Sequence, residues 1–363
     1  MNVLIIGAGA IGSLIGGKLA VAGHRVTLAG RPLFAATVRE HGLIIEDVQD
    51  RYWIRNLTPA GSLDEALDQA DEPFDLAVFT VKSYDTDTAL EELKRAVVIH
   101  GAAMPALLSM QNGVGNEETL AAAVGPERVL AGVITTPVSV PEIGIIHVDK
   151  PRYNVGLSRW SPAGTMPLFD RWVEAMAEAG FTPTVYADAQ GMKWTKLFMN
   201  MTGNATSAIL DAPPEEVFAE TSMVDLEIDA WREALAVMKA AGIGLQNMDG
   251  YPFRWLAGPI RVAPKALLRP VLRKQVSGAR GGKMPSLHMD LHSGKDRSEV
   301  AWLNGAVVRA GMALGIPTPV NNVLTRTVLE LIDDPIAGDE WRKNYARLVV
   351  EVERERAGVK RET

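Results

Sequence analysis

Short runs of apolar residues alternate with helix-like segments over the first half of the chain. Buried strands are predicted by such runs at residues 3–7, 25–30, 76–81, 106–111 and 128–133. Between the first two runs, residues 11–22 have the pattern of a helix that Gly23 ends. Strands that are apolar throughout and separated by helices are typical of βαβ units in a parallel sheet. Two later segments extend this pattern, because residues 144–157 predict an added hairpin and residues 182–186 a last strand.

The pattern changes near residue 187. Beyond it the strand patterns give way to long helical patterns, and the charged residues after about 350 predict a frayed helix end. A chain of 363 residues is long enough for two domains. We therefore expect an α/β domain over residues 1–187 and an all-α domain over residues 188–363.

Composition narrows the class of protein. Apolar residues make up 47% and charged residues 22%, as in ordinary globular proteins. The net charge of −7 argues against bulk nucleic-acid binding, and the absence of Cys excludes disulfides, thiolate zinc sites and a cysteine nucleophile. No secretory leader and no stretch of about 20 apolar residues is found. We expect a cytoplasmic protein without a membrane partner, whose oligomeric state is left open, a homodimer included.

One segment stands apart by its charge. Residues 251–289 contain eight Lys or Arg residues and neither Asp nor Glu. Such a segment could face an anion or an acidic partner. It could also be a solvated basic face of an acidic protein, which is the interpretation we favour.

The amino terminus carries the pattern G-x-G-x-x-G, formed by Gly7, Gly9 and Gly12. The pattern is weak alone, but here it follows a predicted strand and opens a predicted helix. Its glycines permit the tight turn, the approach of the backbone to a pyrophosphate, and close helix–strand packing. The helix N-terminus adds N–H donors for phosphates. We expect a Rossmann-type dinucleotide-binding domain whose cofactor loop consists of Gly7, Ala8, Gly9, Ala10, Ile11 and Gly12.

The end of the second predicted strand bears on the choice of cofactor. NAD sites usually place Asp or Glu there, about 20 residues past the glycine loop, on the ribose 2′-hydroxyl. This chain has Ala29, Gly30 and Arg31 instead. A guanidinium can pair with a 2′-phosphate, which an acidic residue would repel. The sequence therefore predicts NADP(H), with Arg31 at the phosphate.

Residues 191–210 have the pattern of an apolar helix with a polar stripe. Lys196, Asn200, Asn204 and Ser207 fall at i, i+4, i+8 and i+11, which places them on one face. Polar groups in so apolar a helix are costly unless a partner satisfies them, and a polar ligand would do so. A partly desolvated lysine suits general acid catalysis. Lys196 is the candidate, although spacing alone does not separate it from Lys193.

A third group of candidates lies between residues 285 and 319. A helix is predicted from Asp296 or Ser298 to Gly315. Glu299 in its first turn is either a site residue or part of a capping box with Asp296. His288 and His292 are spaced i, i+4, so a metal pair is conceivable. Because no third ligand is evident nearby, we predict no metal site.

These groups, in this order, resemble the ketopantoate reductase (2-dehydropantoate 2-reductase) family. The resemblance covers most of the chain and rests on GAGAIGS, FTVKSYDT, SMQNGVGNEE, KWTKLFMNMTGNATSAI and SEVAWLNGAVVRAGMALGIPTPVN. It implies a Rossmann-type domain followed by an all-helical domain, with the active site between them. It also implies an NADPH-dependent reduction of 2-dehydropantoate to pantoate by hydride transfer.

The resemblance also implies roles for individual residues. Lys196 matches the general acid, and Glu299 a glutamate near that lysine and the substrate. Lys82 and Asn112 match positions that contact NADPH. Substrate contacts are implied for Asn200, Asn204 and Ser286, the last at the substrate carboxylate.

The chain departs from the family pattern in two respects. Lys283 stands where the family often has asparagine, and it could also pair with a substrate carboxylate. The chain is longer than the usual member, with much of the excess in residues 251–283. Both features leave open a paralogue that acts on another small 2-oxo or 2-hydroxy acid. A non-catalytic NADPH-sensing protein is a further alternative, against which the intact Lys196, Asn200 and Glu299 argue.

Overall fold

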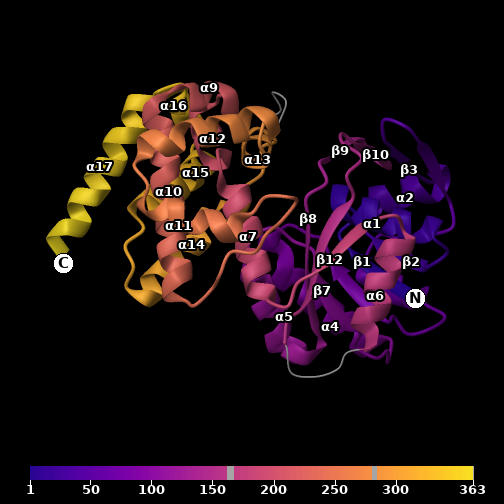
Figure 1. The fold of residues 1–363 in the computed structure, drawn as a ribbon. Helices are drawn as coiled ribbons and strands as arrows, with labels where there is room; N and C mark the ends of the chain where they lie inside the picture. The colour runs from indigo at the N-terminus through magenta and orange to yellow at the C-terminus, as the bar shows by residue number, and fades with distance from the viewer. Residues whose placement is uncertain (162–166, 280–283, 363) are drawn as a thin grey trace. The chain divides into compact units, whose positions relative to one another are not determined.

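The computed structural model describes residues 1–161, 167–279 and 284–362. The chain divides into two compact units, Met1–Lys193 and Trp194–Thr363. The division falls within helix α7 (Ala189–Met201), a few residues beyond the change of pattern near residue 187. The chain thus has an α/β Rossmann-type unit followed by an all-α unit (Figure 1).

An eight-stranded sheet forms the centre of the first unit, with the strand order β12-β11-β8-β7-β6-β1-β2-β5. All neighbouring strands in it are parallel except β11 and β8. The predicted strands at residues 3–7, 25–30, 76–81, 106–111, 128–133 and 182–186 are confirmed within one or two residues. The strands are β1 (Asn2–Ile6), β2 (Arg25–Ala29), β5 (Thr58–Ala60), β6 (Leu76–Phe79), β7 (Ala106–Ser109), β8 (Val129–Ile134), β11 (Asn154–Arg159) and β12 (Thr182–Val185).

Alternation along β1 explains how this sheet is covered. Val3 and Ile5 belong to one buried cluster, and Leu4 and Ile6 to another on the opposite face. Helices cover both faces, as Figure 1 shows. The first cluster includes side chains of α1 and α6, and the second those of α3, α4 and α5. The helices of this unit are α1 (Ala10–Val21), α2 (Pro32–His41), α3 (Leu63–Asp68), α4 (Thr86–Ile99), α5 (Asn116–Val124) and α6 (Pro167–Glu178).

A second sheet of four strands has the order β4-β3-β10-β9. It consists of β3 (Leu43–Glu46), β4 (Arg51–Ile54), β9 (Val138–Glu142) and β10 (Ile145–Val148). The predicted hairpin over residues 144–157 is wrong, because β10 pairs with β9 and β3, whereas β11 pairs antiparallel with β8. Two short apolar runs close in sequence do not specify each other as partners, since pairing depends on distant strands.

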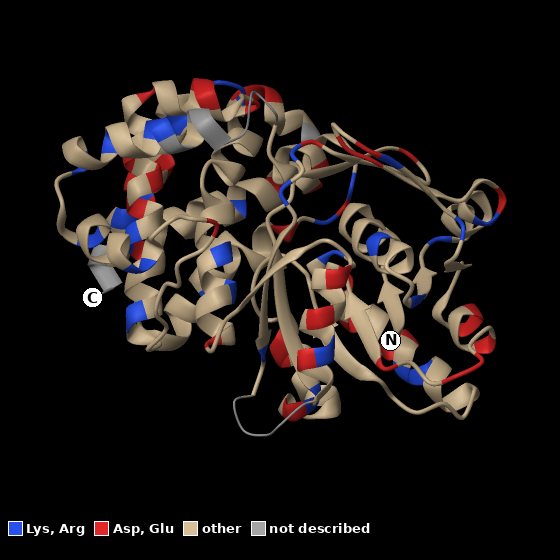
Figure 2. Ribbon diagram, turned by 45° about the vertical axis from the view of Figure 1, so that its right-hand side comes forward, with Lys and Arg blue, Asp and Glu red and all other residues tan. Residues whose placement is uncertain are grey.

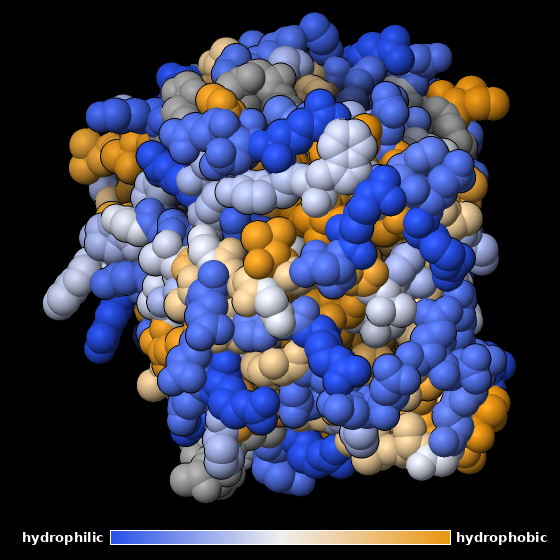
Figure 3. Space-filling view, turned by 90° about the vertical axis from the view of Figure 1, so that its right-hand side faces the viewer, coloured by the Kyte–Doolittle hydropathy of each residue, from blue (hydrophilic) through white to orange (hydrophobic). Residues whose placement is uncertain are grey.

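The second unit consists of helices, among which the 20-residue α10 (Thr221–Ala240) is buried along much of its length. Among the described residues, no helix combines the length and the apolar character needed to cross a bilayer. Figure 3 views the molecule from the side of the first unit, where hydrophilic residues dominate and apolar patches lie between them. The other helices of this unit are α8 (Asn204–Leu210), α9 (Pro214–Ala219), α11 (Phe253–Val262), α12 (Lys265–Ala279), α13 (Ser286–His292), α14 (Asn304–Leu314), α15 (Pro319–Asp333), α16 (Gly338–Trp341) and α17 (Tyr345–Glu362).

The helix predicted over residues 191–210 is interrupted. Helix α7 ends at Met201 and α8 begins at Asn204. Gly203 between them has a φ of +65°, and a Cβ there would lie 2.9 Å from the ring of Phe218. The polar stripe is therefore not one helix face: Lys196 and Asn200 belong to α7, and Asn204 opens a new helix.

The helix predicted from residue 296 or 298 to 315 is also interrupted. Ser298 is its cap, and its hydroxyl accepts a hydrogen bond from the N–H of Val300. A 3₁₀ turn, η3 (Glu299–Trp302), precedes α14, whose C-cap residue Gly315 has a φ of +67°. Glu299 directly follows the cap, so the capping box between Asp296 and Glu299 is wrong.

Part of the basic segment is paired with acidic residues of its own unit. The Lys265 ammonium lies 2.6 Å from the Asp229 carboxylate, and the Arg269 guanidinium 2.6 Å from that of Asp225. Both acidic residues belong to α10, four residues apart. Figure 2 shows basic and acidic residues close together on helices of this unit. Lys265 and Arg269 are thus paired within the unit. The other basic residues that the structure describes are exposed, as a solvated face predicts: Arg254, Arg261, Arg273 and Lys274. Arg280 and Lys283 lie outside the described residues.

Candidate active site

The glycine loop has the form that a dinucleotide needs. Gly7 has a φ of +109°, and a Cβ there would lie 2.6 Å from the Val81 nitrogen. A Cβ at Gly12 would lie 2.0 Å from the carbonyl oxygen of Gly7. A Cβ at Gly9, in contrast, would meet no heavy atom of the described residues within 4 Å. The first and third glycines are required by the fold, and the second borders open space where a ligand can approach the backbone.

The start of α1 completes this loop. Gly9 is its N-cap, no side chain of the described residues caps it, and its first turn has no acidic residue. The N–H groups of the first turn of a helix have no partner within the helix. Together with the helix dipole they favour an anion. The backbone at Ala8, Ala10 and Ile11 therefore lies at a helix end that favours an anion, and the binding of a pyrophosphate there stays a prediction.

Arg31 stands exposed at the carboxyl end of β2. It is the N-cap residue of α2 and follows Gly30, whose N–H donates to the carbonyl of Ala60. In this sheet β2 lies beside β1. Arg31 thus follows the strand next to the glycine loop, which is where dinucleotide-binding domains hold the adenosine ribose.

Two loops at the carboxyl ends of β6 and β7 are joined by a buried polar network. The Ser83 hydroxyl donates to the carbonyl of Asn112 over 2.7 Å. The Asn116 carboxamide donates to the Ser83 hydroxyl over 3.1 Å, and the Gln111 carboxamide donates to the Thr86 hydroxyl over 2.7 Å. These contacts fix the backbone next to Lys82 and at Asn112, the two positions implied in cofactor binding. Sequence reasoning missed the network, although its residues lie in the motifs that carry the resemblance.

Lys193 is part of a buried ion pair. Its ammonium lies 2.8 Å from the carboxylate of Glu117, and the two side chains are 2% and 1% exposed. The ammonium also donates to the carbonyl of Gln111 over 2.7 Å. Both interactions are with the first unit: Gln111 lies in the loop after β7, and Glu117 belongs to α5. This distinguishes Lys193 from Lys196, which lies one turn further on and is partly exposed.

The substrate candidates of the second unit are brought together in part. The Asn204 carboxamide donates to the Ser286 hydroxyl over 3.4 Å and to the Asn200 carbonyl over 3.2 Å. Its oxygen accepts a hydrogen bond from the N–H of Leu287 over 3.1 Å. Asn204 therefore connects the start of α8 to the start of α13, where Ser286 lies. Glu299 is 2% exposed and opens η3.

A buried carboxylate that sequence reasoning missed holds the break between α7 and α8. Glu227 of α10 is 1% exposed. Its carboxylate accepts from the Gly203 N–H over 3.1 Å and from the Thr206 hydroxyl over 2.7 Å. A buried acid in the apolar face of a long helix was the available signal. Glu227 fixes the turn that places Asn204.

Comparisons with known proteins match both units. The sequence model of "Ketopantoate reductase PanE/ApbA" matches residues 3–160, and that of "Ketopantoate reductase PanE/ApbA C terminal" matches residues 188–331. The 2-dehydropantoate 2-reductase of Halobacterium salinarum is 30% identical over 342 residues, which are 92% of this chain and 98% of that protein. The chain belongs to the ketopantoate reductase family.

Further relatives agree. The 2-dehydropantoate 2-reductase of Pyrococcus horikoshii is 29% identical over 324 residues, which are 89% of this chain and 95% of that protein. A PanE/ApbA family ketopantoate reductase from Ralstonia eutropha has a TM-score of 0.76 and 29% identity, covering 92% of this chain and 99% of that structure. A D-mandelate dehydrogenase solved with NADH and anilino(oxo)acetate, with a TM-score of 0.73 and 20% identity, covers 92% of this chain and 99% of that one and shares the fold. Family membership makes the chain an oxidoreductase of the type that acts on a ketone or the corresponding alcohol.

Proposed function

We propose that this protein reduces 2-dehydropantoate to pantoate with NADPH. The observation that carries the proposal is the connection of Asn204 to Ser286. Two side chains 82 residues apart, each implied in substrate binding, meet through one carboxamide. The substrate is a small 2-oxo acid, so its carboxylate and hydroxyl groups need hydrogen-bond donors and acceptors such as these.

The residues of the first unit fit the cofactor. Residues 7–12 would hold the pyrophosphate, with the N–H groups of α1 as donors. Arg31 would pair with the 2′-phosphate, while Lys82 and Asn112 would contact the cofactor from the two joined loops. When bound, NADPH supplies the hydride for the ketone carbon. The choice of NADP over NAD rests on Arg31 and on the lack of a carboxylate at the end of β2.

The residues of the second unit would handle the proton and the substrate. Lys196 would donate the proton that the carbonyl oxygen requires as negative charge develops on it. Glu299 would position the Lys196 ammonium or a substrate hydroxyl. Ser286 would hold the substrate carboxylate, and Asn200 and Asn204 would orient the remainder.

The test follows NADPH oxidation by the purified protein with 2-dehydropantoate, with NADH in parallel. Turnover specific for NADPH is expected. Lys196→Ala should lower kcat by about 10²–10⁴-fold while cofactor affinity is kept, since general acid catalysis contributes on that order. A variant with near-normal kcat would show that Lys196 is not the general acid.

A specific observation favours one alternative, a paralogous enzyme for another small 2-oxo or 2-hydroxy acid. Lys283 replaces the asparagine that the family often has near the substrate serine, and it lies outside the described residues. A panel of 2-oxo acids tests this alternative. Faster turnover of another acid would reassign the substrate, whereas tight NADPH binding without turnover of any acid would favour a cofactor sensor.

A further inference from the structure

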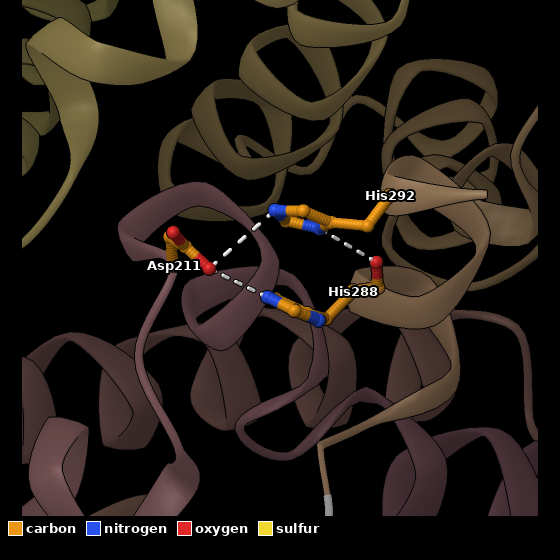
Figure 4. Close-up of side chains that lie close together, drawn as sticks. All are labelled: Asp211, His288 and His292. Carbon is orange, nitrogen blue, oxygen red and sulfur yellow. Dashed lines mark hydrogen bonds and ion pairs between the residues drawn. The ribbon is translucent and has the colours of Figure 1, made fainter. Parts of the chain in front are cut away.

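Three side chains outside the site described above form a compact cluster. Asp211 follows α8 as its C-cap residue, and His288 and His292 lie one turn apart on α13 (Figure 4). The Nε2 of His288 lies 2.7 Å from Oδ1 of Asp211, and the Nε2 of His292 lies 3.4 Å from the same oxygen. The two imidazole rings are stacked with centroids 3.9 Å apart. Asp211 is thus a possible third ligand, which lies too far from the two histidines in the sequence to be evident there.

The hydrogen bond of His292 to the main chain directs its other ring nitrogen at Asp211. Its Nδ1 lies 3.0 Å from the carbonyl oxygen of His288, which can only accept a hydrogen bond. Nδ1 therefore carries the proton, and in the neutral ring Nε2 has a free lone pair. Nε2 lies 3.4 Å from a carboxylate oxygen of Asp211, so a metal ion placed between the two atoms could be bound by both.

The donor set and its geometry suit a metal ion. One ligand atom from each of the three side chains lies within 4.8 Å of the others. A histidine whose second ring nitrogen donates to a backbone carbonyl is oriented as metal-binding histidines are. The side chains of Asp211, His288 and His292 are 30%, 13% and 48% exposed, so an ion can reach them from solvent. Two imidazoles and a carboxylate favour a divalent transition metal over Mg²⁺ or Ca²⁺.

Arg342 acts on the same carboxylate from the other side. Its Nε lies 3.0 Å from Oδ2 of Asp211, which leaves Oδ1 directed at the histidines. This contact leaves the second carboxylate oxygen of Asp211 available as a ligand for an ion held with the two histidines. The guanidinium nevertheless repels a second cation, so the affinity should be moderate.

We propose that Asp211, His288 and His292 bind one divalent transition-metal ion such as Zn²⁺, with water completing the coordination. The ion would fasten the end of α8 to α13. These two elements already meet at their other ends through Asn204 and Leu287. The proposed role is structural, and it does not depend on the identity of the substrate.

The test measures Zn²⁺ binding to the chelator-treated, dialysed full-length protein by calorimetry. One ion per chain is expected, with a Kd on the order of micromolar, as suits three ligands open to solvent. His292→Ala should weaken binding at least about tenfold, because one of three ligands is lost. His100→Ala is the matched control: His100 lies 3.0 Å from Asp64 in a pair of the same kind that lacks a second histidine.

The control variant should bind Zn²⁺ as the wild type does. Saturating Zn²⁺ should also raise the Tm of the wild type and of the control, but not that of His292→Ala. His292→Gln, which keeps a polar side chain of similar reach, serves as a second variant should the alanine protein fail to fold. The proposal is overturned by a wild type that binds no Zn²⁺ below about 100 μM, by equal losses in the His292 and His100 variants, or by equally tight binding of Mg²⁺.

Discussion

Removing the ammonium of Lys193 should destabilise the first unit strongly. In Lys193→Met the Glu117 carboxylate keeps its burial but loses the charge 2.8 Å away. No hydrogen-bond donor among the described residues reaches either oxygen of Glu117 in place of that ammonium. Breaking a buried pair from one side costs about 3–5 kcal/mol. The variant also loses the hydrogen bond to the Gln111 carbonyl, so we expect the upper part of that range.

The double variant isolates the charge effect. In Lys193→Met with Glu117→Gln neither charge remains, and a neutral pair of similar volume often costs little. We expect it to recover at least about 2 kcal/mol of the loss in Lys193→Met. Glu117→Gln alone should lower the free energy of unfolding less than Lys193→Met, because the Lys193 ammonium keeps its hydrogen bonds to the carbonyls of Gln111 and Gly132.

The assay is urea unfolding, in which hydrogen exchange measured by mass spectrometry reports how far each peptide has unfolded. Peptides from β6, β7 and α5 report on the first unit separately, which matters because a chain with two units need not unfold in one step. A loss below about 1 kcal/mol in Lys193→Met would refute the reasoning. So would a double variant as unstable as the single one, since the cost would then come from packing and not from the unpaired charge.

Three further predictions concern the cofactor loop, the cofactor choice and pH. Gly9→Ala should fold normally but weaken NADPH binding at least about tenfold in a fluorescence titration, because its Cβ enters the space assigned to the pyrophosphate. Gly12→Ala should instead lower the Tm, because its Cβ would lie 2.0 Å from a carbonyl oxygen. Arg31→Ala should raise the KM for NADPH by about 10–100-fold and leave that for NADH nearly unchanged, which is measured in parallel assays. Burial raises the pKa of Glu233 from 4.5 to about 7, so the folded state binds its proton more tightly than the unfolded state. The free energy of unfolding should therefore fall, by at most about 3 kcal/mol, as pH rises from about 4.5 to about 7, and urea unfolding of Glu233→Gln should show a flatter pH dependence.

Local patterns in the sequence predict much of the first unit. Runs such as residues 76–81 and 106–111 are apolar on both faces, and only a strand covered on both sides buries them. The glycine loop could be predicted equally well, because two of its requirements arise within the loop itself: the positive φ of Gly7 and the close approach of Gly12 to the Gly7 carbonyl oxygen. The strands that pair with β10 could not be predicted from the sequence, because a four-residue apolar strand fits several neighbours. Which neighbours it pairs with depends on the rest of the sheet.

The candidate site of the second unit shows where periodicity fails. A helical repeat from Lys196 to Ser207 reads correctly as far as Met201, and then Gly203 turns the chain. Gly203 is only a weak local signal of that turn, because the group that stabilises the turn is a carboxylate on another helix. The Glu227 carboxylate accepts a hydrogen bond from the Gly203 N–H, which in a continuous helix would donate to a backbone carbonyl of the same helix.

The same break gives Asn204 a different role from the one a helix stripe suggests. A carboxamide on a continuous helix would present both its polar atoms to a ligand. At the start of α8 the Asn204 side-chain oxygen instead accepts a hydrogen bond from the Leu287 N–H, and its nitrogen donates to the Ser286 hydroxyl. Asn204 is therefore held in place before any substrate arrives, and its N–H groups are aimed where the proposed carboxylate contact lies. Preorganisation of this kind lowers the entropic cost of orienting a small substrate. The interruption of the helix, which the sequence pattern missed, is thus what makes the asparagine useful to the proposed reaction.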